Sequence, residues 1–377
     1  MFSAPSPAIF SNILLTWFSA NARDLPWRKT TDPYKIWLSE IILQQTRVAQ
    51  GMPYYHAFTE AYPTVNALAL APLEEVLRLW QGLGYYSRAR SLHNTAQTVI
   101  EEYNGIFPTA YADLLKLKGI GPYTAAAVAS FSANERAAVV DGNVYRVLAR
   151  VFGIQEDIMS GSGKRRFAEL ALALIPYDKP GEYNQAIMEF GALQCVPVNP
   201  LCMLCPLRET CFAYNNNMVR LLPVKTPKAK VTERYINYLA VFSHGKLLMH
   251  KRTGKDIWEG LYEFPIFEST SAGRNLSAGE LIAEILPGNH NVEIMENLPA
   301  FKHLLTHRRL IISVVAVVLP NLQLVDSGIL PGSGIRESDP GKSFNLTGDF
   351  NWYSKEQVSG LPKPVPVLHS LLKLNFV

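Results

Sequence analysis

The chain has 377 residues, 48% of them hydrophobic and 18% charged, which excludes a disordered protein and allows two or three folded domains. The net charge is only +4, and residues 1–212 carry 18 basic and 18 acidic side chains, so a strongly basic chain is also excluded. No apolar run is long enough to span a membrane. Residues 9–20 lack the basic flank and cleavage site of a signal peptide, so we expect a cytoplasmic protein.

Helical patterning dominates the first part of the chain. Asp32 before Pro33 is a helix-start signal, because the Asp side chain caps the first turn and proline fits the first helical position. Apolar side chains then recur at helical spacing through Ile42. Further helices are predicted at Leu73–Gln81, Ser87–Glu102, Tyr111–Leu117, Tyr123–Phe131, Asn143–Phe152, Gly163–Ile175 and Tyr183–Leu193. We therefore expect an all-α domain over residues 1–212.

The pattern changes after the last cysteine. Residues 213–231 are rich in asparagine, proline and lysine and are predicted to form a linker. Beyond it, segments rich in β-branched and aromatic residues are typical of strands. The predicted strands are Tyr235–Phe242, Lys246–Lys251 and Leu310–Leu319, and the predicted helices are Ala278–Ile285 and Lys355–Ser359. Residues 232–377 should therefore form a second, α/β domain.

All four cysteines lie in residues 195–211, separated by six, two and five residues. A disulfide framework would join distant segments of a small secreted domain, whereas this clustering in a long cytosolic chain indicates a metal site. Thiolates bind either tetrahedral zinc or an iron–sulfur cluster. A zinc ribbon usually places two Cys-x2-Cys pairs a dozen or more residues apart, so one [4Fe–4S] cluster held by Cys195, Cys202, Cys205 and Cys211 fits better. Buried cysteines without a metal are the remaining alternative.

A glycine-rich segment, Leu117-Lys118-Gly119-Ile120-Gly121-Pro122-Tyr123, stands between two predicted helices. Gly119 and Gly121 allow positive φ angles and close approach of a ligand. The amides of the hairpin and of the following helix start can then hold a phosphate. An ordinary helix–helix turn explains Gly-Ile-Gly equally well when the segment is taken alone.

Two carboxylates are candidates for acid–base chemistry. Asp141 lies eighteen residues after Tyr123 and directly precedes the helix from Asn143. Its carboxylate would accept amide hydrogen bonds and lie at the positive helix end, so it should stay ionised, although a helix cap alone would look the same. Glu40 lies on a helix among apolar neighbours, and desolvation there would raise its pKa and favour the protonated form. An exposed surface glutamate is the alternative for Glu40.

These motifs together resemble the MutY-type adenine DNA glycosylases of the helix-hairpin-helix superfamily, to which endonuclease III also belongs. The resemblance is carried by the cysteine spacing, the hairpin followed by Asp141, and Leu38-Ser39-Glu40-Ile41-Ile42-Leu43-Gln44-Gln45-Thr46, which resembles the segment with the family's catalytic glutamate. It implies that Glu40 protonates adenine N7 as general acid. Asp141 would stabilise the oxocarbenium-like sugar, and Asn143 joins them in the candidate catalytic set.

The residue after the hairpin separates MutY-type enzymes from endonuclease III. Strand-cleaving members of the superfamily carry a lysine there that forms a Schiff base with the sugar. This chain has Tyr123, which cannot form an imine, so base excision without efficient strand cleavage is implied. We expect Tyr123 to form a hydrogen bond near Asp141; a packing aromatic at a helix start is the alternative.

Three further stretches resemble DNA-contacting segments of the same family. In Asp24-Leu25-Pro26-Trp27-Arg28, the resemblance implies that Arg23, Trp27 and Arg28 face the flipped base or its backbone, although Trp27 would also suit a core. Gly82-Leu83-Gly84-Tyr85-Tyr86-Ser87-Arg88 resembles a duplex-probing loop. Tyr85 and Gln45 would fill the gap that the flipped nucleotide leaves. Asn184-Gln185-Ala186 matches a segment that reads the adenine edge, which makes Gln185 a base-contact candidate.

Residues 232–377 resemble the Nudix-like domain with which MutY enzymes read 8-oxoguanine, and Trp258-Glu259-Gly260-Leu261-Tyr262-Glu263-Phe264-Pro265 is typical of it. The Arg-Glu-x-x-Glu-Glu run that binds magnesium in Nudix hydrolases is absent from the sequence, so pyrophosphatase activity is not expected. The family's reading loop is often Phe-Ser-His. Here Leu305, Thr306 and His307 stand at the matching place, so the hydroxyl and imidazole remain but the aromatic side chain does not.

The sequence therefore predicts a monomeric base-excision repair enzyme, nucleoid-associated in the cytoplasm, that removes adenine mispaired with 8-oxoguanine or guanine in double-stranded DNA. It would have an all-α domain at residues 1–212 with an iron–sulfur loop at 195–211, a linker at 213–231 and a Nudix-like domain at 232–377. The competing hypotheses are an endonuclease III-like pyrimidine glycosylase/lyase and a non-catalytic iron–sulfur DNA-binding protein.

Overall fold

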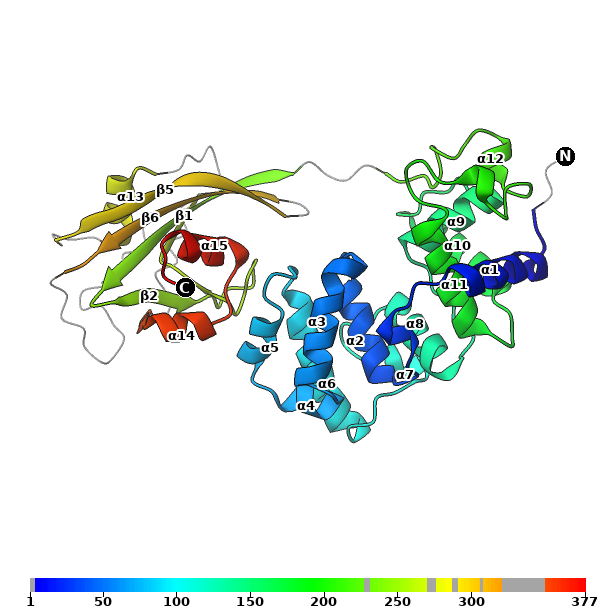
Figure 1. Cartoon of the computed structure of the whole chain (residues 1–377), viewed down its shortest axis with the longest axis horizontal. Helices are drawn as coiled ribbons and strands as arrows, with labels where there is room; N and C mark the ends of the chain where they lie inside the picture. The colour runs from blue at the N-terminus through cyan, green and yellow to red at the C-terminus, as the bar shows by residue number, and fades with distance from the viewer. Residues whose placement is uncertain (1–3, 227–230, 270–275, 287–290, 306–307, 321–349) are drawn as a thin grey trace. The chain divides into compact units, whose positions relative to one another are not determined.

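A computed structural model describes residues 4–226, 231–269, 276–286, 291–305, 308–320 and 350–377. Contacts divide the chain into two compact units (Figure 1). Unit 1 consists of residues 1–70 and 91–227, and unit 2 of residues 71–90 and 228–377. The segment 71–90 thus groups by contact with the C-terminal residues. None of the helices in the described ranges is long and apolar enough to cross a membrane.

Helices make up the described secondary structure of unit 1. Their bounds are α1 (Pro7–Asn21), α2 (Pro33–Leu43), α3 (Val48–Ala61), α4 (Val65–Leu70), α6 (Ser87–Tyr103, whose first turn groups with unit 2), α7 (Tyr111–Leu114), α8 (Pro122–Ala133), α9 (Gly142–Phe152), α10 (Gly161–Leu174), α11 (Pro180–Leu193) and α12 (Phe212–Asn215), with short 3-10 turns η1 (Pro26–Arg28) and η2 (Cys202–Leu204). Helix α2 packs against α3 and α8, and α11 packs against α1, α8 and α9 (Figure 1). This packing brings together helices that lie far apart in the first 212 residues, from α1 to α11.

Local sequence explains where the site-bearing helices begin. The Asp32 side chain accepts the amide of Tyr34 at 3.0 Å, and Pro33 occupies the first position of α2, as predicted. Asp141 caps α9 in the same way, and Gly153 ends that helix in the left-handed conformation. The apolar face of α9 contributes Val147, Leu148 and Val151 to a core shared with α1, α10 and α11. The capping residues Asp141 and Gly153 therefore determine where α9 begins and ends, and the burial of its apolar face holds the helix in the core.

Unit 2 contains a mixed sheet with helices. Its elements are α5 (Leu73–Leu79), β1 (Thr232–Ser243), β2 (Lys246–Lys251), β3 (Tyr262–Glu263), β4 (Ile266–Ser269), α13 (Ala278–Ile285), β5 (Glu293–Leu304), β6 (Arg308–Val318), β7 (Asn351–Tyr353), α14 (Lys355–Gly360) and α15 (Val365–Lys373). The strand order is β3-β2-β1-β6-β5, with β4 beside β1 and β7 beside β2. The pair β1–β6 is parallel, and β5–β6 is an antiparallel hairpin.

The two faces of the sheet meet different helices. Leu239 and Val241 of β1 share a core with Leu281 and Ile285 of α13. Neighbouring positions on a strand point to opposite faces. Phe242 accordingly packs on the other side, with its ring centroid 5.1 Å from that of Phe376, just after α15. The expected fold class, an all-α part followed by a sheet-containing α/β part, is confirmed.

Candidate functional site

Glu40 is buried at the carboxyl-terminal half of α2. Only 7% of its surface is exposed, and the Tyr123 hydroxyl donates a hydrogen bond to its Oε2 at 2.6 Å. Tyr123 stands in the first turn of α8, so the α2–α8 packing makes this contact. The hydroxyl donates to Glu40, and the charge of Asp141, near which the sequence predicts it, also acts on Tyr123.

The surroundings of Glu40 raise its pKa to about 7. Desolvation by burial is the largest cause, and the negative charge of Asp141 acts in the same direction. The hydrogen bond from Tyr123 and the positive charge of Arg28 oppose the rise. Glu40 is thus a carboxyl group that can carry a proton near neutral pH, as the apolar sequence around it indicated.

Asp141 combines a helix cap with a side-chain contact. Its Oδ1 accepts the amides of Asn143 at 2.9 Å and Val144 at 2.8 Å, and its Oδ2 accepts the Asn143 side-chain amide at 2.8 Å. Burial raises the pKa of Asp141, while these hydrogen bonds and the charge of Arg146 act to lower it. The sequence predicts the hydrogen bonds and the helix end that favour an ionised Asp141, but not the burial that opposes them.

Asn143 belongs to a chain of hydrogen bonds that reaches the cysteine loop. The Arg146 guanidinium donates to Asn143 Oδ1 at 2.8 Å, to the Gly191 carbonyl at 2.7 Å and to the Cys195 carbonyl at 2.7 Å. Gly191 has no room for a side chain, because a Cβ there would lie 2.6 Å from that of Asn143. The position of Asn143, and with it the Asp141 carboxylate, is thus set by α9, α11 and the first cysteine together.

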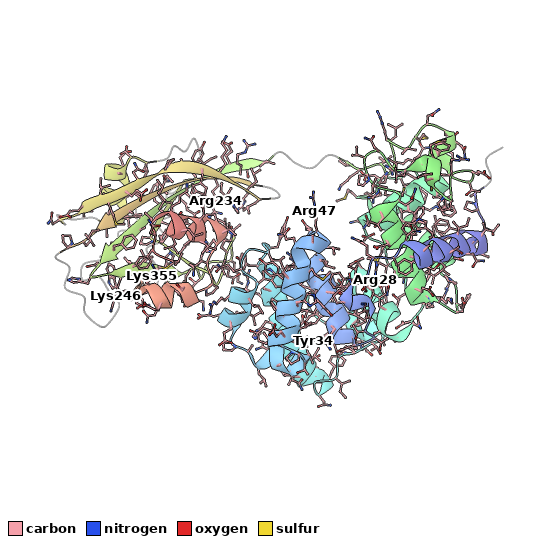
Figure 2. All side chains as sticks on the ribbon, viewed as in Figure 1. Arg28, Tyr34, Arg47, Arg234, Lys246 and Lys355 are labelled. Carbon is pink, nitrogen blue, oxygen red and sulfur yellow. The ribbon has the colours of Figure 1, made fainter. Side chains whose placement is uncertain are left out.

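A buried carboxylate that the sequence does not predict, Glu189, holds Arg23 and Arg28. Glu189 of α11 is 1% exposed and accepts hydrogen bonds from Arg23 at 2.6–3.0 Å and from Arg28 at 2.9–3.1 Å. Burial acts to raise the pKa of Glu189, but the two arginines outweigh it and lower the pKa to about 2. A glutamate on a mostly apolar helix was the available signal. Arg28, which is labelled in Figure 2, therefore pairs with the Glu189 carboxylate while its positive charge also acts on Glu40.

Of two other predicted pocket residues, Trp27 is buried and Gln185 is half-buried. Trp27 is 8% exposed and packs edge-on against Tyr55, with centroids 5.2 Å apart. Gln185 is half-buried, and its neighbour Asn184 is almost fully buried. The Asn184 side chain donates to Ser130 and to the Ala137 carbonyl at 3.0 and 2.8 Å, so it ties α11 to α8 and to the segment before Asp141.

The glycine hairpin has the geometry of an open helix start. Gly119 has φ of +87°, a value that side chains disfavour. Gly121 caps α8 without a capping side chain, and nothing lies within 4 Å of the place where its Cβ would be. The first amides of α8 lack intrahelical partners, as at every helix start. Backbone donors thus stand at an uncrowded surface where an anion can approach.

Two exposed residues with left-handed backbones stand at loop tips. Gln45, between α2 and α3, has φ of +55° and an exposed side chain. The exposed Arg47 projects from the start of α3 just beyond it (Figure 2). Tyr85 of unit 2 has φ of +49° and is 44% exposed. Positive φ is uncommon for residues other than glycine and often marks functional positions.

Unit 2 has a cavity of about 570 Å³ beside the β5–β6 hairpin. Aromatic and charged side chains line it, among them Tyr85, Arg90, Trp258, His303 and Arg308. Thr306 and His307 lie outside the described residues. Next to them, the Leu305 amide donates to the Arg308 carbonyl at 2.8 Å and closes the hairpin.

The four cysteines are free thiols, all partly buried. Cys195, Cys205 and Cys211 pack against the core of α1, α9, α10 and α11. Arg150 donates to Cys195 Sγ at 3.4 Å, the Leu207 amide to Cys205, and the Ala213 and Tyr214 amides to Cys211. Such donors suit thiolate ligands of a cluster. Among the described residues, no three His, Cys, Asp or Glu side chains, these cysteines included, lie close enough together to hold a metal ion.

Comparison with known proteins finds matches along the whole chain. Residues 38–171 match the HhH-GPD superfamily of base excision DNA repair proteins, and residues 237–373 match the NUDIX domain. An adenine DNA glycosylase of Buchnera aphidicola subsp. Baizongia pistaciae is 31% identical over 369 residues, 97% of each chain. An adenine DNA glycosylase of Homo sapiens is 44% identical over 213 residues, 54% of this chain and 39% of the relative. The structure of a thermostable thymine-DNA glycosylase aligns with a TM-score of 0.51 at 32% identity, over 56% of this chain and 97% of that one.

Proposed function

We propose, since this chain belongs to the adenine DNA glycosylase family, that Glu40 and Asp141 cleave the N-glycosyl bond of adenine opposite 8-oxoguanine or guanine. The chain is thus a base-excision repair enzyme, a hydrolase acting on N-glycosyl bonds in DNA. The observation that carries the division of roles is the buried, Tyr123-bound Glu40 beside a hydrogen-bonded Asp141.

Glu40 acts as the general acid. A neutral adenine is a poor leaving group, and protonation at N7 removes the negative charge that would develop on it. A carboxyl with a pKa of about 7 keeps a large protonated fraction at neutral pH and is still acidic enough to donate the proton. After transfer, the ionised Glu40 accepts a proton from the water that attacks the sugar. Tyr123, whose pKa is raised well above its usual value, stays protonated and donates to the carboxylate that remains.

Asp141 stabilises the positive charge that forms on the sugar. Its three hydrogen bonds fix the carboxylate and favour its ionised form against the effect of burial. Asn143 contributes two of them and is itself held by Arg146. We assign Asn143 a positioning role, since its contacts are to Asp141.

The remaining pocket residues bind the extruded nucleotide. Arg23 and Arg28 form ion pairs with Glu189, and the charge of Arg28 limits the rise of the Glu40 pKa. Trp27, which stands next to Arg28 in the chain, supports this side of the pocket from the core. Gln185 contacts the adenine edge. Because Tyr123 replaces the amine of strand-cleaving relatives, the enzyme excises the base without efficient strand cleavage.

The hairpin and two loop tips engage the duplex. The open helix start after Gly119 and Gly121 binds a backbone phosphate. Gln45 and Tyr85 enter the space left by the flipped adenine, which their exposed side chains and outward loop tips favour. With a net charge near zero for residues 1–212, DNA binding depends on these local groups.

Thr306 and His307 read 8-oxoguanine on the opposite strand. They belong to the Nudix-like domain proposed for residues 232–377. Within the segment 213–231, proposed as the linker to the glycosylase domain of residues 1–212, Ala213 and Leu222 pack in the core of unit 1. The cavity next to the β5–β6 hairpin is lined by Trp258 and His303, flat side chains that suit a base. The enzyme works as a monomer on nucleoid DNA in the cytoplasm.

Cys195, Cys202, Cys205 and Cys211 hold a [4Fe–4S] cluster. When bound, the cluster supplies a rigid centre for the 195–211 loop and takes no part in base excision. Arg150 and the amides that already donate to these sulfurs would stabilise the thiolates.

Single-turnover assays on a set of duplexes test this function. Adenine is placed opposite 8-oxoguanine, guanine, cytosine or thymine, and thymine opposite guanine tests the competing base preference. We expect fast adenine release opposite 8-oxoguanine, slower release opposite guanine, and little release from the other duplexes. Equal release of adenine from all four contexts would contradict the mispair specificity, and release of thymine alone would contradict the substrate.

A further inference from the structure

The loop that presents Tyr85 has a backbone that needs support. Gly82, Gly84 and Tyr85 have φ angles of +97°, +79° and +49°. Glycine adopts such angles freely, but for a tyrosine this conformation is strained, because its Cβ approaches the following carbonyl oxygen. An exposed ring on such a backbone would relax to other conformations unless neighbouring groups held it.

Two donors converge on the peptide that precedes Tyr85. The indole Nε1 of Trp80, a fully buried side chain, donates to the Gly84 carbonyl at 2.9 Å. Arg88, in the first turn of α6, donates from Nη2 to the same carbonyl at 3.2 Å. The carbonyl of Gly84 and the nitrogen of Tyr85 belong to one planar peptide, so the two donors fix the direction in which Tyr85 leaves the loop.

Arg88 also contacts the Tyr85 ring. Its guanidinium carbon lies 5.1 Å from the ring centroid of Trp80 and 5.4 Å from that of Tyr85. A guanidinium at this distance from an aromatic face makes a favourable cation–π contact. Burial lowers the pKa of Arg88 to about 10, so the group is still charged at neutral pH. The exposed Tyr85 is thereby linked through Arg88 to the buried Trp80.

We propose that Arg88 is a positioning residue that holds Tyr85 in the conformation used to enter the DNA stack. The inference rests on the proposed role of Tyr85 as a duplex-probing side chain. Ordering the loop before DNA binds removes an entropy cost from the step in which the adenine leaves the helix. Lysine would keep the charge but not the planar group that contacts a ring and a carbonyl together.

A double-mutant cycle tests whether Arg88 acts through Tyr85. Single-turnover adenine release opposite 8-oxoguanine is measured, below saturating enzyme, for Arg88→Met, Tyr85→Ala and the double variant. We expect Arg88→Met to slow release roughly 3- to 30-fold, the range of one cation–π contact. In the Tyr85→Ala background the same substitution should change the rate by less than about twofold. Arg78→Met, an exposed arginine of α5, controls for loss of charge and should leave the rate unchanged.

Hydrogen exchange of the free protein provides a readout that does not depend on DNA. Amides of residues 82–86 should exchange faster in Arg88→Met than in the parent, and those of α8 should not change. Arg88→Lys, which keeps the charge and most of the stem, is the second variant if Arg88→Met does not fold, and it should show the same pattern with smaller factors.

Three results would overturn the inference. Equal slowing by Arg88→Met in both Tyr85 backgrounds would mean that Arg88 acts independently of Tyr85, and the function proposed for Tyr85 would survive. Unchanged exchange at residues 82–86 would mean that Arg88 does not order the loop. An unchanged rate in Tyr85→Ala would instead show that the proposed role of Tyr85 is wrong, and the inference would fall with it.

Discussion

The pKa of Glu40 depends on burial and on three neighbours from different segments of the chain. Burial within α2 and the charge of Asp141 raise its pKa, and the Tyr123 hydroxyl and Arg28 limit the rise to about 7. Removing any one contribution should move the pKa in a known direction. Substitutions of these neighbours can therefore be tested by the direction in which they shift the Glu40 pKa.

Glu40→Gln should nearly abolish adenine release while leaving mismatch binding intact, because the amide keeps the shape of the side chain but cannot donate the proton. General acid catalysis is worth about 10²–10⁴-fold, so the single-turnover rate should fall by at least the lower value. Glu101→Gln, an exposed position on α6, is the matched control. A Glu40→Gln enzyme that releases adenine at the parent rate would show that the acid lies elsewhere.

Tyr123→Phe should shift the pH dependence of the single-turnover rate to higher pH on its basic side. The hydrogen bond from Tyr123 stabilises ionised Glu40, so its loss raises the Glu40 pKa. Because the proton is needed for catalysis, the rate in the parent should fall as the pH rises above the Glu40 pKa of about 7. In the variant the fall should begin roughly one unit later. A basic limb that stays in place or moves to lower pH would contradict this assignment of the hydrogen bond.

At the scale of elements, sequence patterns predicted the bounds of those helices and strands that their own residues determine. The Asp32–Pro33 and Asp141 caps, the α13 range Ala278–Ile285 and the β2 range Lys246–Lys251 match the structure. Strand β5 (Glu293–Leu304) was not predicted. It carries exposed charged and polar residues, a proline and two register irregularities, so its pairing with β6 and not its own composition makes it a strand.

The candidate site was only partly accessible from sequence for the same reason. Glu40 and Asp141 stood in recognisable motifs, but the Tyr123–Glu40 contact requires α2 to pack against α8. Glu189 has no motif of its own, and its role follows from two arginines, 166 and 161 positions away in the chain, that donate to it. The raised pKa of Asp141 depends on burial by the whole unit, which a local pattern does not contain.

Gly191→Ala should disturb the site through helix packing alone. The added methyl group would lie 2.6 Å from Asn143 Cβ, so α9 and α11 must separate or Asn143 must move away from Asp141. Overpacking of this kind costs about 1–3 kcal/mol of stability. We expect a lower unfolding midpoint and slower adenine release. Gly161→Ala, where nothing lies within 4 Å of the new Cβ, is the control and should change neither; equal stability of the two variants would contradict the close approach.

The four clustered cysteines lead to a prediction about the iron content of the purified protein. Protein purified without oxygen should be yellow-brown and contain about four irons per chain, as one [4Fe–4S] cluster requires. Cys202→Ser should lower the iron content, because it removes one of the four proposed thiolate ligands. The matched control is Ser162→Ala, an exposed residue at the start of α10, which should leave the iron content unchanged. One zinc and negligible iron in the parent protein would contradict the cluster.

At the scale of the whole molecule, the residues proposed for the chemistry and those proposed to read the opposite base lie in different parts of the chain. Glu40 and Asp141 belong to unit 1, whereas the hairpin next to Thr306 and His307 belongs to unit 2. The loop with Tyr85 also groups with unit 2 and lines the same cavity as Trp258 and His303. A change confined to the hairpin should therefore alter which mispair is repaired and leave the bond-breaking groups as they are.

Thr306→Ala combined with His307→Ala should selectively erode the preference for adenine opposite 8-oxoguanine over adenine opposite guanine. The two opposite bases differ by an added carbonyl oxygen and a new N7 proton, and a hydroxyl and an imidazole are suited to sense these groups. Each contact is worth about 1–3 kcal/mol, so the ratio of the two single-turnover rates should fall at least several-fold. The rate opposite guanine should change much less, because Glu40 and Asp141 are untouched.

The control for this double variant is Lys246→Ala with Lys355→Ala, two exposed lysines of the same domain (Figure 2). Their loss removes positive charge without touching the hairpin, so both rates should fall together through weaker DNA binding or stay as they are. If Thr306 and His307 only stabilised their loop, the two substrates would likewise suffer alike. A rate ratio that stays unchanged in the Thr306→Ala, His307→Ala variant would therefore place the reading of 8-oxoguanine on other residues of unit 2.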